Sequence, residues 1–405
     1  MEMKREEISS KARGLYSKEQ MIRNYLQEYD AEGRKERILL IDVNCRYSST
    51  GNIVYDLYQG IRADGRTAAV CYGRGPFVSG ENIVKFGLDQ ETLTHMFLSR
   101  LTGYNGCYSP RSTSRLLAYI EQFQPDLIHI HELHAYFVDI EPLLRLIRKK
   151  NIPVVWTFHS EYMYTGKCGY TYECQNFMHG CGSCPRLSAY PKSFFFDHTA
   201  EMLKKKQQLL EPLNLRIVTP SGWLADRVRL SFLKDRPIRV IFNGVDTEIF
   251  HPKNPASLRR MLGIPEDGKV VLAVAPNLLI RRKGGAWVLK LAEEMKEEPV
   301  WFVMKGMPKN QKSEMEHVIF SAKTGDMKEL ADYYSLADVF VLFSNRETFS
   351  MTCAEALCCG TPVTGFRCGA PETIFEEPEA YFTDYGNIAD AAEHIRGLLG
   401  LGTSS

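Results

Sequence analysis

The chain has 405 residues, of which 44% are hydrophobic and 24% charged, and its formal net charge is +1. This length predicts two or three domains of ordinary globular composition. The near-zero charge argues against nucleic-acid binding, and the chain has no run of about 18 apolar residues that would predict a membrane span. The charged N-terminus is unlike a signal peptide, so we expect a cytoplasmic protein whose eleven cysteines are mostly reduced thiols or metal ligands.

Strands and helices alternate through the first half of the chain. Residues 1–36 are polar and helix-prone, and we expect an N-terminal helical extension there. The alternation that follows predicts a doubly wound parallel sheet in a domain of residues 37–245. The predicted strands are 38–43, 68–71, 127–130, 154–158, 216–218 and 239–242, and the predicted helices are 51–63, 112–123 and 141–149.

A second alternation begins after residues 243–255, which are rich in Gly, Pro and Asn and read as a linker. It predicts a second α/β domain of residues 256–405. Two consecutive parallel sheets are expected to face a cleft at the carboxyl ends of their strands, where ligands bind in such folds. The predicted strands are 270–274, 300–304, 318–321, 339–343 and 362–364, and the predicted helices are 285–296, 327–335, 351–359 and 389–399.

Two carboxylates in the second domain are the most informative residues. Glu347 follows an apolar strand, and Glu355 lies about one turn into the next helix. The backbone N–H groups between them would form the start of that helix, where an anion is favoured. Two surface glutamates at helical spacing are the plain alternative, so the functional reading depends on the surrounding motifs.

Four motifs, in their order along the chain, resemble those of retaining glycosyltransferases with the GT-B fold, specifically family GT4. They are Thr157-Phe158-His159, Asn243-Gly244-Val245-Asp246, Arg282-Lys283-Gly284 and Glu347-x7-Glu355. The resemblance covers nearly the whole chain from about residue 37. It implies two Rossmann-like domains, an acceptor domain followed by a donor domain, and hexosyl transfer with retention of anomeric configuration.

The resemblance places a nucleotide-sugar donor, a UDP- or GDP-sugar, on the second domain. Glu355 would accept hydrogen bonds from the ribose, and Glu347 would bind the sugar. Lys283 and Arg282 would neutralise the pyrophosphate, which removes the need for a catalytic metal or other cofactor. A solvated loop lysine is the alternative for Lys283, and the sequence leaves open whether Arg281 or Arg282 points inward. The remaining donor-binding positions implied are Phe349, Ser350, Met351, Thr352 and Gly369.

Polar residues at the strand ends of the first domain are the candidates for the acceptor side. By resemblance, His159 would contact the donor sugar near the reaction centre, although a histidine that only caps the strand is the alternative. His131 and His134 follow the preceding strand, and Gly51 and Asn52 open the first helix. The resemblance assigns these four to the acceptor side, whereas local hydrogen bonding explains the two histidines equally well.

A cysteine-rich loop, residues 160–190, follows His159. Its cysteines have the spacing C-x5-C-x6-C-x2-C, and in a reducing compartment four clustered thiols suggest a structural Zn²⁺ site. Buried free thiols are the alternative. The four residues are Cys168, Cys174, Cys181 and Cys184.

The acceptor implied by the resemblance is a polysaccharide, a glycan or a lipid-linked oligosaccharide. A sugar-nucleotide epimerase and a non-catalytic scaffold subunit are the alternatives on the same fold. Basic runs in the first domain suggest peripheral contact with the inner face of the membrane, or merely solvated helix faces. These runs are Arg145, Arg148, Lys149 and Lys150, and Lys204, Lys205 and Lys206.

Overall fold

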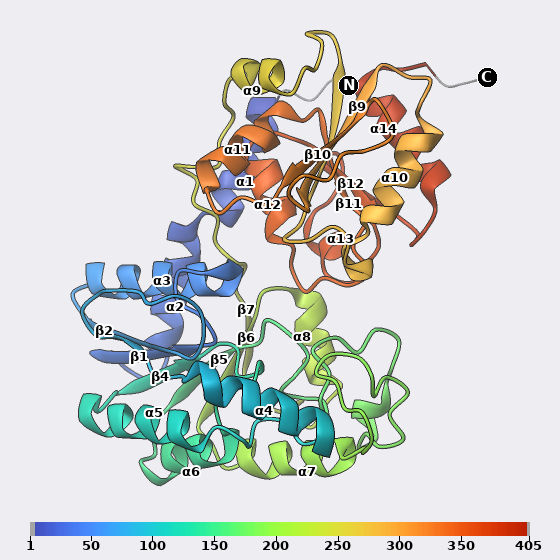
Figure 1. The fold of residues 1–405 in the computed structure, drawn as a ribbon. Helices are drawn as coiled ribbons and strands as arrows, with labels where there is room; N and C mark the ends of the chain where they lie inside the picture. Colours follow the sequence, from blue (N-terminus) through green and yellow to red (C-terminus); the bar gives the residue numbers. More distant parts are fainter. Residues whose placement is uncertain (1–4, 403–405) are drawn as a thin grey trace. The chain divides into compact units, whose positions relative to one another are not determined.

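The computed structural model describes residues 5–402. The chain divides into two compact units, which are treated separately below (Figure 1). The first unit comprises Met21–Phe242. The second unit joins the N-terminal segment, up to Gln20, with the chain from Asn243 onward.

The first unit contains a seven-stranded parallel sheet in the order β3-β2-β1-β4-β5-β6-β7 (Figure 1). Its central strands are buried on both faces, which explains their nearly continuous apolar sequences. The strand order reverses direction between β1 and β4, so the sheet is doubly wound. The strands are β1 (Arg37–Asp42), β2 (Thr67–Tyr72), β3 (Ile83–Lys85), β4 (Leu127–Ile130), β5 (Val154–Thr157), β6 (Leu215–Thr219) and β7 (Ile238–Val240).

The helices that cover this sheet follow their sequence patterns. In α6, Leu143, Leu144 and Ile147 are buried while Arg145 and Arg148 are exposed, as an amphipathic helix on a sheet requires. The helices are α2 (Lys18–Tyr29), whose first three residues belong to the second unit, α3 (Ser48–Ala63), α4 (Asp89–Thr102), α5 (Pro110–Phe123), α6 (Ile140–Lys149), η1 (Asn176–Met178), α7 (Thr199–Leu210) and α8 (Gly222–Arg229).

The second unit contains a six-stranded parallel sheet in the order β10-β9-β8-β11-β12-β13. The reversal between β8 and β11 puts the loops that follow these two strands next to each other at the carboxyl edge. The strands are β8 (Lys269–Val274), β9 (Val300–Met307), β10 (Val318–Ala322), β11 (Val339–Leu342), β12 (Val363–Phe366) and β13 (Ala380–Thr383).

Helices surround this second sheet, and the first of them comes from the N-terminal extension. Helix α1 packs against α12, although more than 300 residues separate them in sequence. The helices are α1 (Arg5–Tyr16), α9 (Ala256–Met261), η2 (Arg281–Lys283), α10 (Gly285–Glu294), α11 (Met327–Leu336), α12 (Met351–Cys358), α13 (Pro371–Ile374) and α14 (Ile388–Leu399).

The predicted strands and helices all form, with ends within three residues of the predicted ones. The sequence patterns missed several elements, among them β3, β13, α4, α7 and α8. The edge strand β3 has only three residues, and α4 carries apolar residues on its solvent side, which obscures its periodicity. Among the described residues, no helix has the length and hydropathy needed to cross a bilayer.

Candidate functional site

Glu347 lies in the loop between β11 and α12, where it meets two cations from the loop after β8. Lys283 Nζ is 2.6 Å from Glu347 Oε1, and Arg282 Nη1 is 3.5 Å from the same oxygen. Burial alone would raise the pKa of this carboxyl, but Lys283 and Arg282 hold its pKa below the ordinary value. Glu347 is therefore an anion fixed between two cations at the carboxyl edge of the sheet.

The backbone at Glu347 is clamped to the loop after β12. Glu347 N–H donates to Cys368 O at 2.9 Å, and Ala370 N–H donates to Glu347 O at 3.1 Å. Gly369, between these partners, has a φ of +126°, a conformation that favours glycine. The Glu372 carboxylate accepts the N–H of Gly369 at 2.9 Å and of Cys368 at 3.0 Å. Gly369 and Glu372 thus hold the loop that presents Glu347.

The Arg-Lys loop, which follows β8 and contains Arg282 and Lys283, reaches Glu347 because Gly284 allows it to approach the backbone of Phe343 closely. Gly284 has a φ of +75°, and a Cβ at this position would lie 2.0 Å from Phe343 O. Asn345 N–H donates to Arg282 O at 2.8 Å, which joins the two loops. Arg282 faces Glu347 while Arg281 is exposed, so the structure selects Arg282 as the inward arginine.

The start of α12 lies between the two glutamates. Ser350 is its N-cap, with a φ of +83°, and Ser350 Oγ accepts the N–H of Cys353 at 3.4 Å. Ser350 Oγ is also 3.1 Å from Thr352 Oγ1. The first N–H groups of a helix have no partner inside the helix, so this turn favours an anion. Met351 is half-buried. The ring of Phe349 is buried in the core, so only the main chain of Phe349 could contact a ligand.

Glu355 lies on α12 and is held from α11. Tyr334 O–H donates to Glu355 Oε2 at 2.8 Å. Burial raises the pKa of Glu355 to about 7, and the tyrosine hydrogen bond opposes this rise. Glu355 therefore changes charge near neutral pH, unlike Glu347.

Donor binding is expected to strengthen with rising pH if Glu355 must be ionised to accept hydroxyl donors. With a pKa of about 7, affinity for UDP-glucose should be about tenfold higher at pH 8 than at pH 6. UDP-glucose is the suitable probe because its pyrophosphate does not titrate in this range. Calorimetric titration of wild type and Glu355→Gln would show a flat profile for the variant. An equally steep profile in Glu355→Gln would contradict the assignment.

In the first unit, His159 and His131 form a buried pair after β5 and β4. His131 Nδ1 lies 3.0 Å from His159 Nε2, and the two rings are nearly parallel. Burial lowers the pKa of His159 to about 4 and also lowers that of His131. Both imidazoles are therefore neutral at physiological pH. His131 is only 1% exposed, so its hydrogen bond with His159 explains its position better than contact with an acceptor would.

His134 belongs to a separate polar cluster with Glu132. His134 Nε2 is 2.7 Å from Glu132 Oε2, and Ser160 O–H donates to the same carboxylate oxygen at 3.1 Å. Burial alone would lower the pKa of His134, but Glu132 raises it. Tyr190 of the cysteine-rich loop lies 2.9 Å from His134 Nδ1 through its hydroxyl. This cluster joins the loop to the carboxyl end of β4.

Gly51 and Asn52 lie in the first turns of α3, which begins three residues earlier than predicted. Gly51 is buried, and a Cβ there would lie 3.1 Å from Asn44 Cβ. Gly51 O accepts Arg46 N–H at 2.8 Å. The close approach predicted for Gly51 is thus made by the chain's own loop after β1, and Asn52 is half-buried beside it.

The four cysteines of the loop are free thiols. Interaction with Cys184 raises the pKa of the Cys168 thiol, and Cys181 Sγ accepts Gly166 N–H at 3.4 Å. Within residues 5–402, no three His, Cys, Asp or Glu side chains, Cys174 included, are grouped as a metal ion would require. The zinc site therefore lacks geometric support and stays a prediction, which metal analysis with and without a chelator would test.

Two buried lysines hold the cysteine-rich loop. Lys167 Nζ donates to the carbonyls of Leu187, Ala189 and Pro191 at 2.6–3.0 Å. Lys206 Nζ donates to carbonyls at the other end of the loop, and burial lowers the pKa of Lys206 to about 7. Lys206 therefore points inward. Of the basic run predicted on α7, only Lys204 and Lys205 remain for an exposed surface.

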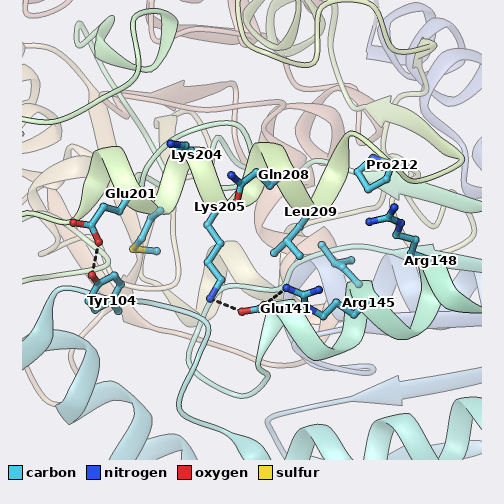
Figure 2. A pocket seen from close by; sticks show the side chains of 12 residues that line it. Tyr104, Glu141, Arg145, Arg148, Glu201, Lys204, Lys205, Gln208, Leu209 and Pro212 are labelled. Atoms are coloured by element: carbon cyan, nitrogen blue, oxygen red, sulfur yellow. Dashed lines mark hydrogen bonds and ion pairs between the residues drawn. The ribbon is translucent and has the colours of Figure 1, made fainter.

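A cavity of about 640 Å³ lies between α6 and α7 (Figure 2). Figure 2 shows Glu141 joined to both Arg145 and Lys205 across it. None of the predicted donor or acceptor residues lines this cavity. Its lining is Tyr104, Glu141, Leu144, Arg145, Arg148, Glu201, Met202, Lys204, Lys205, Gln208, Leu209 and Pro212.

Sequence reasoning missed the residues that hold the predicted ones. Tyr334 orients Glu355, and Glu372 fixes the loop beside Glu347. Glu132 pairs with His134. Glu372 adjoins the predicted Gly369 turn, so its capping role could have been inferred from the turn. Tyr334 carried no such signal, because its contact with α12 depends on how two helices pack.

Comparison with known proteins agrees with this arrangement. The chain matches the families described as Glycosyltransferase Family 4 over residues 50–249 and Glycosyl transferases group 1 over residues 268–400. It is 25% identical over 363 residues to a protein of Escherichia coli K12 named as a colanic acid biosynthesis glycosyl transferase, WcaC, covering 84% of this chain and 85% of that one.

A D-inositol 3-phosphate glycosyltransferase of Catenulispora acidiphila is 27% identical over 214 residues, which is 48% of this chain and 50% of that relative. The chain thus matches about half the length of this relative. Among solved structures, a sucrose-phosphate synthase of Thermosynechococcus elongatus has a TM-score of 0.66 at 20% identity, covering 90% of both chains. The Anabaena protein Alr3699/HepE, in complex with UDP-glucose, has a TM-score of 0.57 at 14% identity, covering 89% of both. The chain therefore belongs to the family 4 glycosyltransferases, with the GT-B fold.

Proposed function

We propose that the protein transfers a sugar from a UDP- or GDP-sugar to a glycan, a polysaccharide or a lipid-linked oligosaccharide, with retention of anomeric configuration. The observation that carries this proposal is the Lys283–Glu347–Arg282 cluster beside the start of α12. It offers cations, helix-terminal amides and a hydroxyl-accepting carboxylate in one place, which matches the phosphates and sugar of such a donor.

The chemistry follows from the leaving group. Breaking the glycosidic bond places growing negative charge on a nucleoside diphosphate. Lys283, Arg282 and the first amides of α12 would stabilise that charge. This route assigns no step to a metal ion. Glu347 would accept hydroxyls of the donor sugar, and Glu355 those of the ribose. The solved complexes of Alr3699/HepE with UDP and with UDP-glucose support a nucleotide-sugar donor by analogy of fold.

We assign the sugar and acceptor contacts to the first unit. His159 is neutral, so it can hydrogen-bond a sugar hydroxyl without bringing a competing charge. His131 would orient His159. His134, with Glu132 and Tyr190, offers an imidazole–carboxylate pair and a hydroxyl that suit the hydroxyls of a glycan acceptor. Gly51 and Asn52, in the first turns of α3, complete the assignment.

The proposal is tested by incubating the purified protein with UDP- and GDP-sugars, with and without a glycan acceptor. Acceptor-dependent release of nucleoside diphosphate is expected, and NMR of the product should show the anomeric configuration of the donor. Release that proceeds equally without acceptor would indicate epimerase or hydrolase chemistry instead. An inverted anomer would overturn the retaining mechanism.

We further propose peripheral contact with an anionic membrane on the cytoplasmic side, through the first unit. Leu93, Phe97 and Leu101 recur every four residues on α4 and are 63%, 63% and 40% exposed. Phe194–Phe196 are exposed beside them, since Phe194 N–H donates to Arg100 O at 2.8 Å. The basic cavity of Figure 2 adjoins this apolar surface through Tyr104, whose ring stacks on that of His198.

Vesicle flotation tests this contact. Binding to vesicles containing phosphatidylglycerol should fall about tenfold in the double variant Phe97→Ser/Phe195→Ser, because burial of the two rings supplies most of the apolar attraction. Met261→Ser removes a 72% exposed side chain from the second unit and is the matched control. Equal binding of the double variant and wild type would exclude this surface.

A further inference from the structure

The N-terminal helices α1 and α2 each pack on one unit, beside candidate residues of that unit. Helix α1 packs on α12, the helix that carries Ser350 and Glu355. Helix α2 packs on the first unit, over the strand ends that lead to His159. None of the motifs that indicated the function lies in these helices, so their contacts are an independent observation.

Helix α1 is fixed to the donor half of the site by a buried stripe. Ile8, Ala12 and Tyr16 recur every four residues and are at most 4% exposed. Ser9 O–H donates to Cys358 O at 2.6 Å, which satisfies one of the last carbonyls of α12. The Tyr16 ring makes an edge contact with Phe349, with centroids 6.2 Å apart. Helix α1 thus holds α12 at its end and at the loop before its start.

Helix α2 is fixed to the histidines of the first unit by two tyrosine hydroxyls. Tyr29 Oη lies 2.8 Å from His129 Nδ1, and Tyr25 Oη lies 2.8 Å from Thr157 Oγ1. His129 Nε2 is also 2.8 Å from Thr157 Oγ1, which closes a buried polar chain. Thr157 is two residues before His159 on the same segment, so this chain ends at the candidate sugar contact.

A column of imidazole rings continues this chain. The rings of His129 and His131 have centroids 4.1 Å apart, and His131 is hydrogen-bonded to His159. Burial lowers the pKa of all three histidines, so the column is neutral. The position of Tyr29 therefore bears on His159 through two intervening rings.

Three glycines lie where residues of the N-terminal segment approach the rest of the chain closely. A Cβ at Gly60 would lie 2.4 Å from Ile22 Cγ2, and one at Gly360 would lie 2.5 Å from Arg5 O. A Cβ at Gly244 would lie 2.6 Å from the Cα of Lys18. Gly60 is inside α3, where glycine is otherwise unfavourable. The rest of the chain is thus shaped to receive these helices, which argues against a loosely attached extension.

We infer that residues 5–29 are a positioning element of the catalytic apparatus. Tyr16, with Ser9, sets the position of α12 and hence donor affinity. Tyr29 fixes the positions of His129, His131 and His159, and hence sets the turnover rate. The inference rests on the proposed function, because the effects are read as donor affinity and turnover. It predicts that variants in α1 change the donor KM and that variants in α2 change kcat. A general loss of stability would not separate these two effects.

The experiment measures kcat and donor KM for point variants, with the folded fraction taken from the stoichiometry of UDP binding by calorimetry. Tyr16→Ala should raise donor KM about tenfold with little change in kcat, and Tyr16→Phe, which keeps the ring, should restore it. Tyr29→Phe removes only a hydroxyl and should lower kcat about tenfold at unchanged KM. Ser9→Ala provides a second, milder variant of α1 should Tyr16→Ala fail to fold.

Two matched controls separate positioning from nonspecific damage. Tyr55→Phe removes a hydroxyl from α3 that accepts a hydrogen bond from Gln59 in the same helix, and Leu15→Ser changes an exposed residue of α1. Both should behave like wild type. Unchanged kinetics in Tyr16→Ala, Ser9→Ala and Tyr29→Phe, with UDP still binding to wild type, would overturn this inference alone. Failure of wild type to bind UDP, GDP or ADP would overturn the proposed function as well.

Discussion

Replacing Glu347 with glutamine is expected to lower kcat/KM by about 10²- to 10³-fold, with the protein still folded. The substitution keeps the shape of the side chain but removes the charge that Lys283 and Arg282 share. The two cations would then be held without their partner, and the sugar would lose a strong acceptor. Loss of one charge-assisted contact to the reacting group typically costs a factor of this size. Steady-state kinetics with saturating acceptor would measure the effect.

Glu393→Gln is the matched control for this variant, because Glu393 is an exposed glutamate on α14 of the same unit. It should retain wild-type kcat/KM. Activity of Glu347→Gln within about threefold of wild type would remove Glu347 from the mechanism. That outcome would favour a role for the Lys283 pair in folding only, and would leave the donor contacts to other residues.

Gly284→Ala should be among the most destabilising single changes in the second unit. The alanine Cβ would have to occupy space 2.0 Å from Phe343 O, and the φ of +75° is itself unfavourable for alanine. We expect a loss of about 3 kcal/mol or more in the free energy of unfolding. The adjacent Lys283 should move away from Glu347, so donor affinity should fall as well. Chemical denaturation and UDP titration would measure the two effects.

Gly397→Ala is the matched control. Gly397 lies inside α14, and nothing is within 4 Å of the position its Cβ would take. Alanine there should be neutral, or more stable by about 0.5–1 kcal/mol, because it lowers the entropy of the unfolded chain. A Gly284→Ala protein as stable as Gly397→Ala would show that the Arg-Lys loop is not held against Phe343.

The parts of the fold that could be predicted from sequence are those encoded locally. The buried strand Val339–Leu342 is a continuous apolar run, and a helix-forming segment follows it, so the placement of Glu347 and Glu355 on loop and helix was predictable. The Arg282-Lys283-Gly284 motif predicted cations near this pair. In the structure both cations reach Glu347, and Arg282 rather than Arg281 is the arginine that does so.

What could not be predicted depends on contacts between distant segments. Tyr334 reaches Glu355 only because α11 packs beside α12, and Tyr29 reaches His129 across 100 residues of sequence. The polar sequence of residues 1–36 gave few apolar positions, yet Tyr16, Tyr25 and Tyr29 bury large rings with their hydroxyls satisfied. Tyrosines that pack in a core and also form a hydrogen bond do not appear as an apolar stripe, so the sequence left open whether these helices dock.

The most direct test of the donor site is a calorimetric titration of UDP, GDP and ADP into wild type and Lys283→Gln, with the matching nucleosides as controls. The account predicts that wild type binds one diphosphate preferentially. It also predicts that Lys283→Gln binds that diphosphate at least about tenfold more weakly, and the nucleoside equally, because Lys283 acts on the phosphates. Equal affinity of both proteins for the diphosphate, or no binding by wild type, would contradict it.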